Sequence, residues 1–333
     1  KLKISIRSSL LGKLIGGKQN NAVNRIKKAD IVILKGGQYI YNDKHTIRSK
    51  IFLWRTLLPI HICSQYGKKT IILGQSIGPF YSDKCKNETI LSLKSVSNII
   101  VREMMSYKML KEYNFIKHVE LAPDTAFYIK PVSVKPKVFM ESDNYFGITV
   151  VNWSFPESNK PDQHKKQYIV NLMDAISHIV DNYNLIPVFI PQVSVKHHGS
   201  SDIDIIKIIR IKLKRNGVET KIVNEDYNAE EMAGVYQKCK FIIGTRLHSC
   251  ILSLVAGSPV IAIRYQGFKT EGVMKMMGLE NFTHDIYTLK SSEIIDSVKK
   301  IIGNYQELTN IISNKVDELQ KDLLGKVKNV IKK

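Results

Sequence analysis

The hydrophobic pattern of the first 125 residues is one of short apolar runs separated by amphipathic stretches. The runs are Ile31–Leu34, Thr70–Leu73 and Ile99–Val101, and β-branched residues are frequent in them. Residues 46–66, and about 103–113, instead have apolar positions at helical spacing. Short β-branched strands alternating with helices indicate an α/β fold with a parallel, doubly wound sheet.

A second alternation of the same kind follows a stretch, residues 130–145, that has no periodicity and that we interpret as an interdomain linker. The tail from Ser291 to Lys333 is predicted to form two helices, of which the last is long and basic. The predicted strands of this half are Phe146–Val151, Ile186–Ile190, Lys221–Val223, Phe241–Ile243 and Pro259–Ile263, and the helices are 164–183, 202–216, 229–238 and 247–256.

These two alternations predict two Rossmann-like domains that face a cleft, the glycosyltransferase-B architecture. We expect an N-terminal domain at 1–140, a second domain at 141–310, and a basic C-terminal helix at 311–333 that crosses back to the first domain. Residues 1–29 contain no convincing β-α unit, so the first unit of the N-terminal sheet is expected to be missing or atypical.

The whole chain has a formal charge of +20, and the positive charge is concentrated in its first part. Residues 1–140 carry 25 Lys and Arg against 8 Asp and Glu, whereas residues 141–333 carry 25 against 22. This asymmetry favours an anionic partner for the N-terminal domain. Leu10, Leu11, Leu14 and Ile15 lie among the first eight cations. Interleaved aliphatic residues favour a membrane surface over nucleic acid.

The composition also argues against several other classes of protein. No apolar run reaches the roughly 18–20 residues of a membrane-spanning helix. The four cysteines have no metal-ligand spacing, which argues against a disulfide scaffold or zinc module and favours a reducing compartment. We therefore expect no metal and no cofactor.

The segment Gly244–Ser249 carries the strongest candidate chemistry. A buried strand is predicted to stop at Gly244, Thr245 to cap the next helix, and Arg246 and His248 to lie in its first turn. Backbone N–H groups, a guanidinium and an imidazole would then meet, which predicts a phosphate or carboxylate site. Cations are unfavourable at a helix N-terminus, so a bound anion is the expected compensation. The alternative is an exposed arginine and a core histidine.

Five motifs occur in a fixed order along the chain, and they are Gln75–Phe80, Val101–Glu103 with Ser106, Ala122–Phe127, Gly244–Ser249, and Leu254–Ile263 with Tyr265 and Lys269. Together they resemble the polysaccharide pyruvyl transferase family, from about residue 30 to 310. Members of that family have a glycosyltransferase-B-like fold and transfer pyruvate from phosphoenolpyruvate to two hydroxyls of one sugar, which gives a cyclic ketal.

The resemblance implies that Arg246, Leu247 and His248 bind phosphoenolpyruvate, and Thr245 lies beside them. Where many members carry an arginine after the first strand of the second domain, this chain has Val151-Asn152-Trp153. Lys269, Arg264 or Arg102 is therefore a candidate for a further donor cation. His248 is the natural proton donor because imidazole titrates near neutrality, with phosphate ligation as its alternative role.

The acceptor site is expected on loops of the first domain and at one strand end of the second. Asp124 is a candidate base, with loop fixing as the favoured role, and His197-His198 near Asp202 and Asp204 are interpreted as a solvated loop rather than a metal site. The candidate acceptor residues are Gly36, Gly37, Gln75, Ser76, Asn152 and Trp153.

The expected function is pyruvyl transfer to a surface polysaccharide or its lipid-diphosphate-linked precursor, in the cytoplasm and at the inner face of the membrane. The main alternative is a glycosyltransferase with a nucleotide-sugar donor, for which Glu230 and Glu231 are the only candidate ribose ligands. A non-enzymatic polyanion-binding protein is the third possibility.

Overall fold

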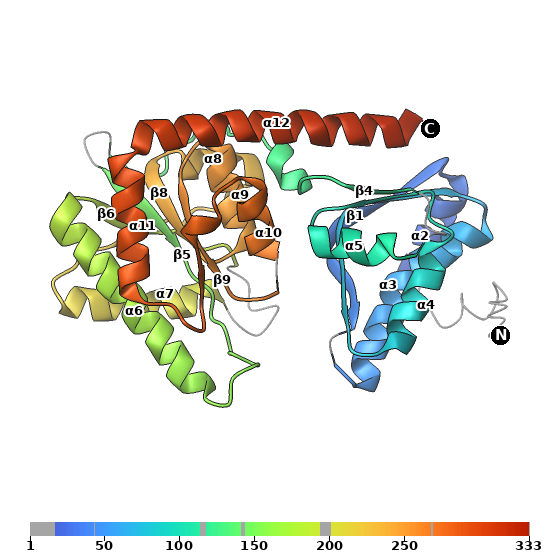
Figure 1. Cartoon of the computed structure of the whole chain (residues 1–333), viewed down its shortest axis with the longest axis horizontal. Helices are drawn as coiled ribbons and strands as arrows, with labels where there is room; N and C mark the ends of the chain where they lie inside the picture. Colours follow the sequence, from blue (N-terminus) through green and yellow to red (C-terminus); the bar gives the residue numbers. More distant parts are fainter. Residues whose placement is uncertain are drawn as a thin grey trace. The chain divides into compact units, whose positions relative to one another are not determined.

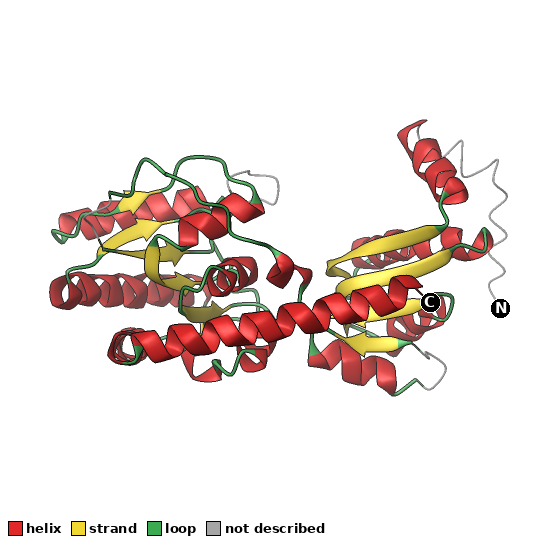
Figure 2. Ribbon diagram, turned by 90° about the horizontal axis from the view of Figure 1, so that it is seen from above, coloured by secondary structure: helices red, strands yellow, loops and turns green. Residues whose placement is uncertain are grey.

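The computed structural model describes residues 17–42, 44–113, 118–140, 144–193, 201–267 and 269–332. The chain divides into two compact units, of which unit 1 is Lys1–Thr125 with Asp322–Lys333 and unit 2 is Ala126–Lys321. Each unit contains its own parallel sheet (Figures 1 and 2). The predicted α/β fold with two Rossmann-like parts is confirmed.

Unit 1 is built on a four-stranded sheet of order β1-β2-β3-β4, in which each connection runs through a helix. Among the described residues no strand precedes β1, and the rest of the predicted atypical first unit, residues 1–16, lies outside them. The elements are α2 Gly17–Lys28, β1 Ile31–Asn42, α3 Ile47–Gln65, β2 Lys69–Phe80, α4 Asp83–Leu93, β3 Asn98–Val101, α5 Met104–Lys111 and β4 Val119–Leu121.

The two faces of this sheet are covered by different parts of the chain. Ile72 and Ile99 pack with buried residues of α3, α4 and α5. Their neighbours Ile71 and Ile100 point to the opposite face because side chains alternate along a strand, and there they pack with Leu323 of α12 (Tyr305–Lys332). The last turns of α12 therefore complete the core of unit 1, as the prediction of a returning C-terminal helix requires.

Strands β1 and β2 are longer than their apolar runs indicate. The predicted strands end at Leu34 and Leu73, but the parallel ladder continues through Gly37, which pairs with Gln75. A Cβ atom on Gly36 would lie 2.0 Å from the Gly74 carbonyl oxygen. The glycines therefore let two backbones approach closely, and they do not end the strand.

Replacement of Gly36 by alanine is expected to destabilise unit 1 by at least the 1–3 kcal/mol that is typical of overpacking, because only backbone atoms could move away. A Gly303→Ala variant, at a position with no heavy atom within 4 Å of the added Cβ, is the matched control. Urea denaturation measures both changes. Equal stability of the two variants would contradict the close approach.

Unit 2 contains a six-stranded sheet of order β10-β9-β8-β5-β6-β7. Helices α6, α7 and α11 cover one face, and α8, α9 and α10 cover the other (Figure 1). The elements are η1 Thr125–Tyr128, β5 Tyr145–Thr149, α6 Pro161–Tyr183, β6 Ile186–Phe189, α7 Asp202–Arg215, β7 Lys221–Ile222, α8 Ala229–Tyr236, β8 Cys239–Gly244, α9 Leu247–Val255, β9 Val260–Arg264, α10 Lys269–Met276, η3 Glu280–Phe282, β10 Thr283–Asp285 and α11 Ser291–Gly303.

The central strands of unit 2 are buried on both faces, and Phe146 of β5 stacks on Phe241 of β8 at 5.4 Å between ring centroids. The chain order reverses between β5 and β8, so the loops after these strands diverge to opposite faces. Such a switch point is where doubly wound sheets bind ligands.

The segment before β5, which the sequence indicates as a linker, packs on unit 2. The backbone N–H of Val132 donates to the carbonyl of Glu230 (3.1 Å), and the chain divides at Thr125 rather than at 140. The described helices include none that combines the length and apolarity needed to cross a membrane.

Candidate functional site

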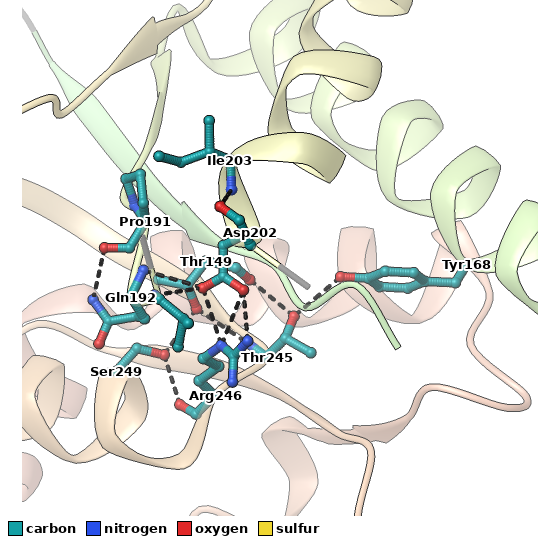
Figure 3. Close-up of polar contacts among 11 residues, drawn as sticks. Thr149, Tyr168, Pro191, Gln192, Asp202, Ile203, Thr245, Arg246 and Ser249 are labelled. Atoms are coloured by element: carbon teal, nitrogen blue, oxygen red, sulfur yellow. Dashed lines mark hydrogen bonds and ion pairs between the residues drawn. The ribbon is translucent and has the colours of Figure 1, made fainter. Parts of the chain in front are cut away.

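The candidate site lies at the switch point of unit 2, where β8 ends and α9 begins. The backbone N–H of Thr245 donates to the carbonyl (3.2 Å) and to the hydroxyl (3.1 Å) of Thr149, the last residue of β5. The Thr149 hydroxyl also lies 2.8 Å from that of Ser249 in the first turn of α9. Figure 3 shows these contacts, which tie the loop to the neighbouring strand.

Thr245 does not cap α9, so that part of the prediction was wrong. Its hydroxyl donates to the Thr149 carbonyl (2.8 Å) and lies 3.3 Å from the hydroxyl of Tyr168, whose pKa burial raises to about 12. The N-cap residue is Arg246, in extended conformation, and among the described side chains none caps the helix. A helix end without a side-chain cap is suited to bind an anion.

A buried carboxylate holds Arg246 in place. Asp202, the first residue of α7, has 1% of its side chain exposed and accepts from Arg246 Nη2 (2.6 Å) and Nε (3.0 Å). It also accepts from the backbone N–H groups of Gln192 (3.1 Å) and Val193 (2.9 Å). A buried ion pair whose carboxylate has these further hydrogen bonds is fully satisfied.

Asp202 changes the expected charge balance at the helix end. The sequence predicts a bound anion as the compensation for Arg246, but the protein itself supplies one. Burial lowers the pKa of Arg246, yet the hydrogen bond and charge of Asp202 raise it by more, so the net shift is upward. The guanidinium is therefore permanently charged and fixed in orientation.

His248 follows as the second residue of α9, and its side chain is exposed, while its neighbour Leu247 packs against the core. His248 is therefore an exposed residue of the helical turn that follows Arg246. Thr245, Arg246, Leu247 and His248 are therefore brought together at one strand end.

An aromatic pair lies close to Arg246. Trp153, after the end of β5, contacts Tyr265 edge to face at 4.9 Å, and its indole N–H donates to the Tyr287 hydroxyl (3.3 Å). Burial raises the pKa of Tyr265, and the charge of nearby Arg246 partly opposes this rise. Trp153 is half-buried, as is Asn152 before it.

The further cations differ in their surroundings. Lys269 is the first residue of α10, which follows β9 at the same edge of the sheet. Arg264 at the end of β9 is paired with Asp285 (2.6 Å). Among the described residues no three His, Cys, Asp or Glu side chains gather as a metal site would require.

The remaining predicted residues lie in unit 1. Arg102 is 6% exposed and is paired with Asp124 (2.5 Å), and its Nε donates to the Ser76 hydroxyl (2.9 Å). Asp124 thus fixes a loop, the role that the sequence favours. Gly36, Gly37, Gln75 and Ser76 lie within β1 and β2, not on loops as predicted, because the ladder continues through them.

Gln75 is the unusual member of this group. It is fully buried, and its Nε2 donates to the Ser76 carbonyl (2.9 Å). Its Oε1 atom has no hydrogen-bond partner among the described residues. An unpaired buried acceptor is costly, and Gln75 has no exposed surface through which it could contact a sugar.

The role of Asp202 is not predicted from the sequence, which places this residue at the start of the helix 202–216, next to a solvated loop. The strand order explains the contact, because β5 lies between β6 and β8 and so brings the start of α7 near the end of β8. His197 and His198 lie outside the described residues.

Comparisons with known proteins identify the family and the fold of the chain. The chain is 24% identical to the amylovoran biosynthesis protein AmsJ of Erwinia amylovora over 316 residues, 91% of this chain and 72% of that protein. Among solved structures, Anabaena HepE in complex with UDP has a TM-score of 0.57 at 10% identity, with 97% and 83% of the two chains covered. A UDP-GlcNAc 2-epimerase of Methanocaldococcus jannaschii has a TM-score of 0.53 at 13% identity, with 85% and 74% covered.

The structural neighbours establish the fold alone, and the family model is more specific. The model for polysaccharide pyruvyl transferase matches residues 2–267, a span that includes the strand β8, Arg246 and His248. The chain is therefore a transferase that belongs to the polysaccharide pyruvyl transferase family.

Proposed function

We propose that the protein transfers the pyruvyl group of phosphoenolpyruvate to two hydroxyls of a sugar in a surface polysaccharide or its lipid-diphosphate-linked precursor. The observation that carries this proposal is the pairing of a fixed guanidinium with an exposed imidazole at an uncapped helix N-terminus. Phosphoenolpyruvate carries a phosphate and a carboxylate, and both are anions of the kind that such a site attracts.

Each residue of the site has a distinct role in this proposal. Arg246 and the N–H groups of α9 bind the donor anion, with Thr245 and Leu247 shaping the turn and Lys269 as a second cation. Asp202 positions Arg246. Asp202 accepts hydrogen bonds from Nε and Nη2 of the guanidinium. Because this edge of the group is occupied, a donor oxygen approaches from another side.

His248 acts as the general acid. The imidazolium gives its proton to C3 of the donor, which leaves an oxocarbenium-like centre at C2. One sugar hydroxyl forms a bond to C2, and its proton returns to the imidazole. The bond from C2 to the phosphate oxygen then breaks, the second hydroxyl closes the ketal, and its proton leaves with the phosphate.

For the acceptor, we propose a contact at the end of β5 in unit 2. The exposed part of Trp153 beside Asn152 offers an aromatic face of the kind that stacks on sugar rings. A lipid-linked acceptor would place the protein at the cytoplasmic face of a membrane, in agreement with the basic composition of unit 1.

Thermal denaturation in the presence of candidate donors tests the proposal. Phosphoenolpyruvate at about 100 times its Kd is expected to stabilise the protein by about 2.7 kcal/mol, and UDP- or GDP-sugars are expected to have no effect. Incubation with phosphoenolpyruvate and lipid-linked sugars should then give the mass gain of a pyruvyl ketal. Stabilisation only by a nucleotide sugar would establish the glycosyltransferase alternative instead.

A further inference from the structure

A groove of about 640 Å³ lies between helices α3 and α4 of unit 1, which are neighbours in Figure 1. Its floor is apolar, since Leu53 and Leu57 are buried there, and Trp54 and Leu91 form parts of its walls. The remaining lining residues are polar or small and are Lys50, His61, Ser64, Ser82, Lys84, Cys85, Glu88, Ser92 and Ser95.

Large apolar side chains beside this groove are exposed to solvent. Ile47, Ile51 and Trp54 of α3 are 78%, 52% and 44% exposed, and Leu91 of α4 is 59% exposed. The three α3 residues are spaced by four and three, so they form one stripe along the helix. An exposed apolar patch of this kind marks an interaction surface, because water contact with it is unfavourable.

The charge around the patch identifies its partner. Residues 44–95 carry nine Lys and Arg against two acids, Asp83 and Glu88. Lys50 and Lys84 are exposed on the two helices that form the groove. Apolar side chains flanked by lysine are suited to the interface of an anionic bilayer. Lysine is depleted in protein–protein interfaces, and aliphatic side chains gain nothing from nucleic-acid phosphates.

We propose that the α3–α4 surface, defined as Ile47, Lys50, Ile51, Trp54, Lys84 and Leu91, docks unit 1 on an anionic lipid bilayer. The apolar side chains enter the boundary between headgroups and acyl chains, and the two lysines bind lipid phosphates. This inference deepens the membrane location proposed above. Its test uses no donor or acceptor, so it can fail while pyruvyl transfer stands.

Tryptophan fluorescence of the full chain reads the insertion directly. The chain has two tryptophans, so a Trp153→Phe variant reports on Trp54 alone. Its emission is expected to shift to the blue with vesicles of phosphatidylcholine and phosphatidylglycerol, and to be quenched by brominated acyl chains. Phosphatidylcholine alone should have no effect. An unchanged spectrum with anionic vesicles would overturn the proposal.

Vesicle sedimentation separates this surface from the rest of the basic chain. The double variants Lys50→Glu/Lys84→Glu and Ile51→Ser/Leu91→Ser are each expected to lower the partition coefficient at least about tenfold. The first loses two lysines, each worth about 1 kcal/mol near the surface, and the second loses two apolar side chains that would leave water on insertion. Matched controls on α7 of unit 2, Lys207→Glu/Lys212→Glu and Ile208→Ser/Ile211→Ser, change equally exposed residues.

The controls should bind as the unaltered protein does, and circular dichroism should show the same fold for all variants. Equal losses in the variants and the controls would mean that net charge, rather than this surface, drives binding. Full binding of the α3–α4 variants would place the contact elsewhere. Either result would overturn the proposal, as would capture of a detergent-dispersed prenyl diphosphate without any vesicle binding.

Discussion

Replacement of His248 by alanine is expected to lower the rate of pyruvyl transfer by about 10²–10⁴-fold, the range that a general acid contributes. The free energy of unfolding should change little, because the side chain is exposed at the second position of α9 and lies outside the core. Steady-state kinetics with phosphoenolpyruvate measures the rate, and urea denaturation measures the stability.

A His248→Gln variant distinguishes the two roles considered for this residue. Glutamine keeps a hydrogen-bond donor for phosphate but cannot deliver a proton near neutral pH. If His248 is the acid, both variants lose activity and both still bind the donor. If it is only a phosphate ligand, the glutamine variant recovers much of the activity. A fully active alanine variant would remove His248 from the mechanism.

Replacement of Arg246 by alanine is expected to abolish transfer and also to destabilise unit 2. The substitution leaves Asp202, which is 1% exposed, as a buried charge without its cation. Breaking a buried pair from one side costs about 3–5 kcal/mol, and the lower end applies here because 21% of the Arg246 side chain is exposed. Steady-state kinetics with phosphoenolpyruvate measures the transfer, and urea denaturation measures the stability.

Substitution of Asp202, the partner of Arg246, supplies the control for this experiment. In an Arg246→Ala/Asp202→Asn double variant the uncompensated charge is removed, so part of the lost stability should return while activity stays absent. The Asp202→Asn single variant should keep Arg246 but hold it less firmly, and it is expected to raise KM for phosphoenolpyruvate more than it lowers kcat. Recovery of activity in the double variant would contradict a donor-binding role for Arg246.

The sequence predicts the second unit well because its strands are buried on both faces. A fully buried parallel strand is a continuous apolar run, and such runs stand out wherever helices separate them. The strand Phe241–Ile243 and the helix 247–256 are therefore found within three residues of β8 and α9. The same pattern brings Arg246 and His248 to a strand end.

Contacts between distant segments could not be read in this way. Asp202 is 44 residues before its partner Arg246, and only the order of the strands brings them together. The sequence predicts a loop at Gly36 and Gly37, because a glycine pair commonly follows the end of a buried strand. In the structure a second backbone at Gly74 occupies the space of the missing Cβ. Both errors concern which strand lies beside which, and local periodicity carries no such information.

The return of α12 to unit 1 has a consequence for the order in which the protein folds. On one face of the first sheet, Ile71 and Ile100 are covered by two residues of α12, Leu323 and Val330. Leu323 and Val330 follow the whole of unit 2 in the chain, so a ribosome must synthesise unit 2 before they emerge. Although it is translated first, the N-terminal unit is therefore the last to close its core, and its uncovered sheet face is the surface that needs protection during synthesis.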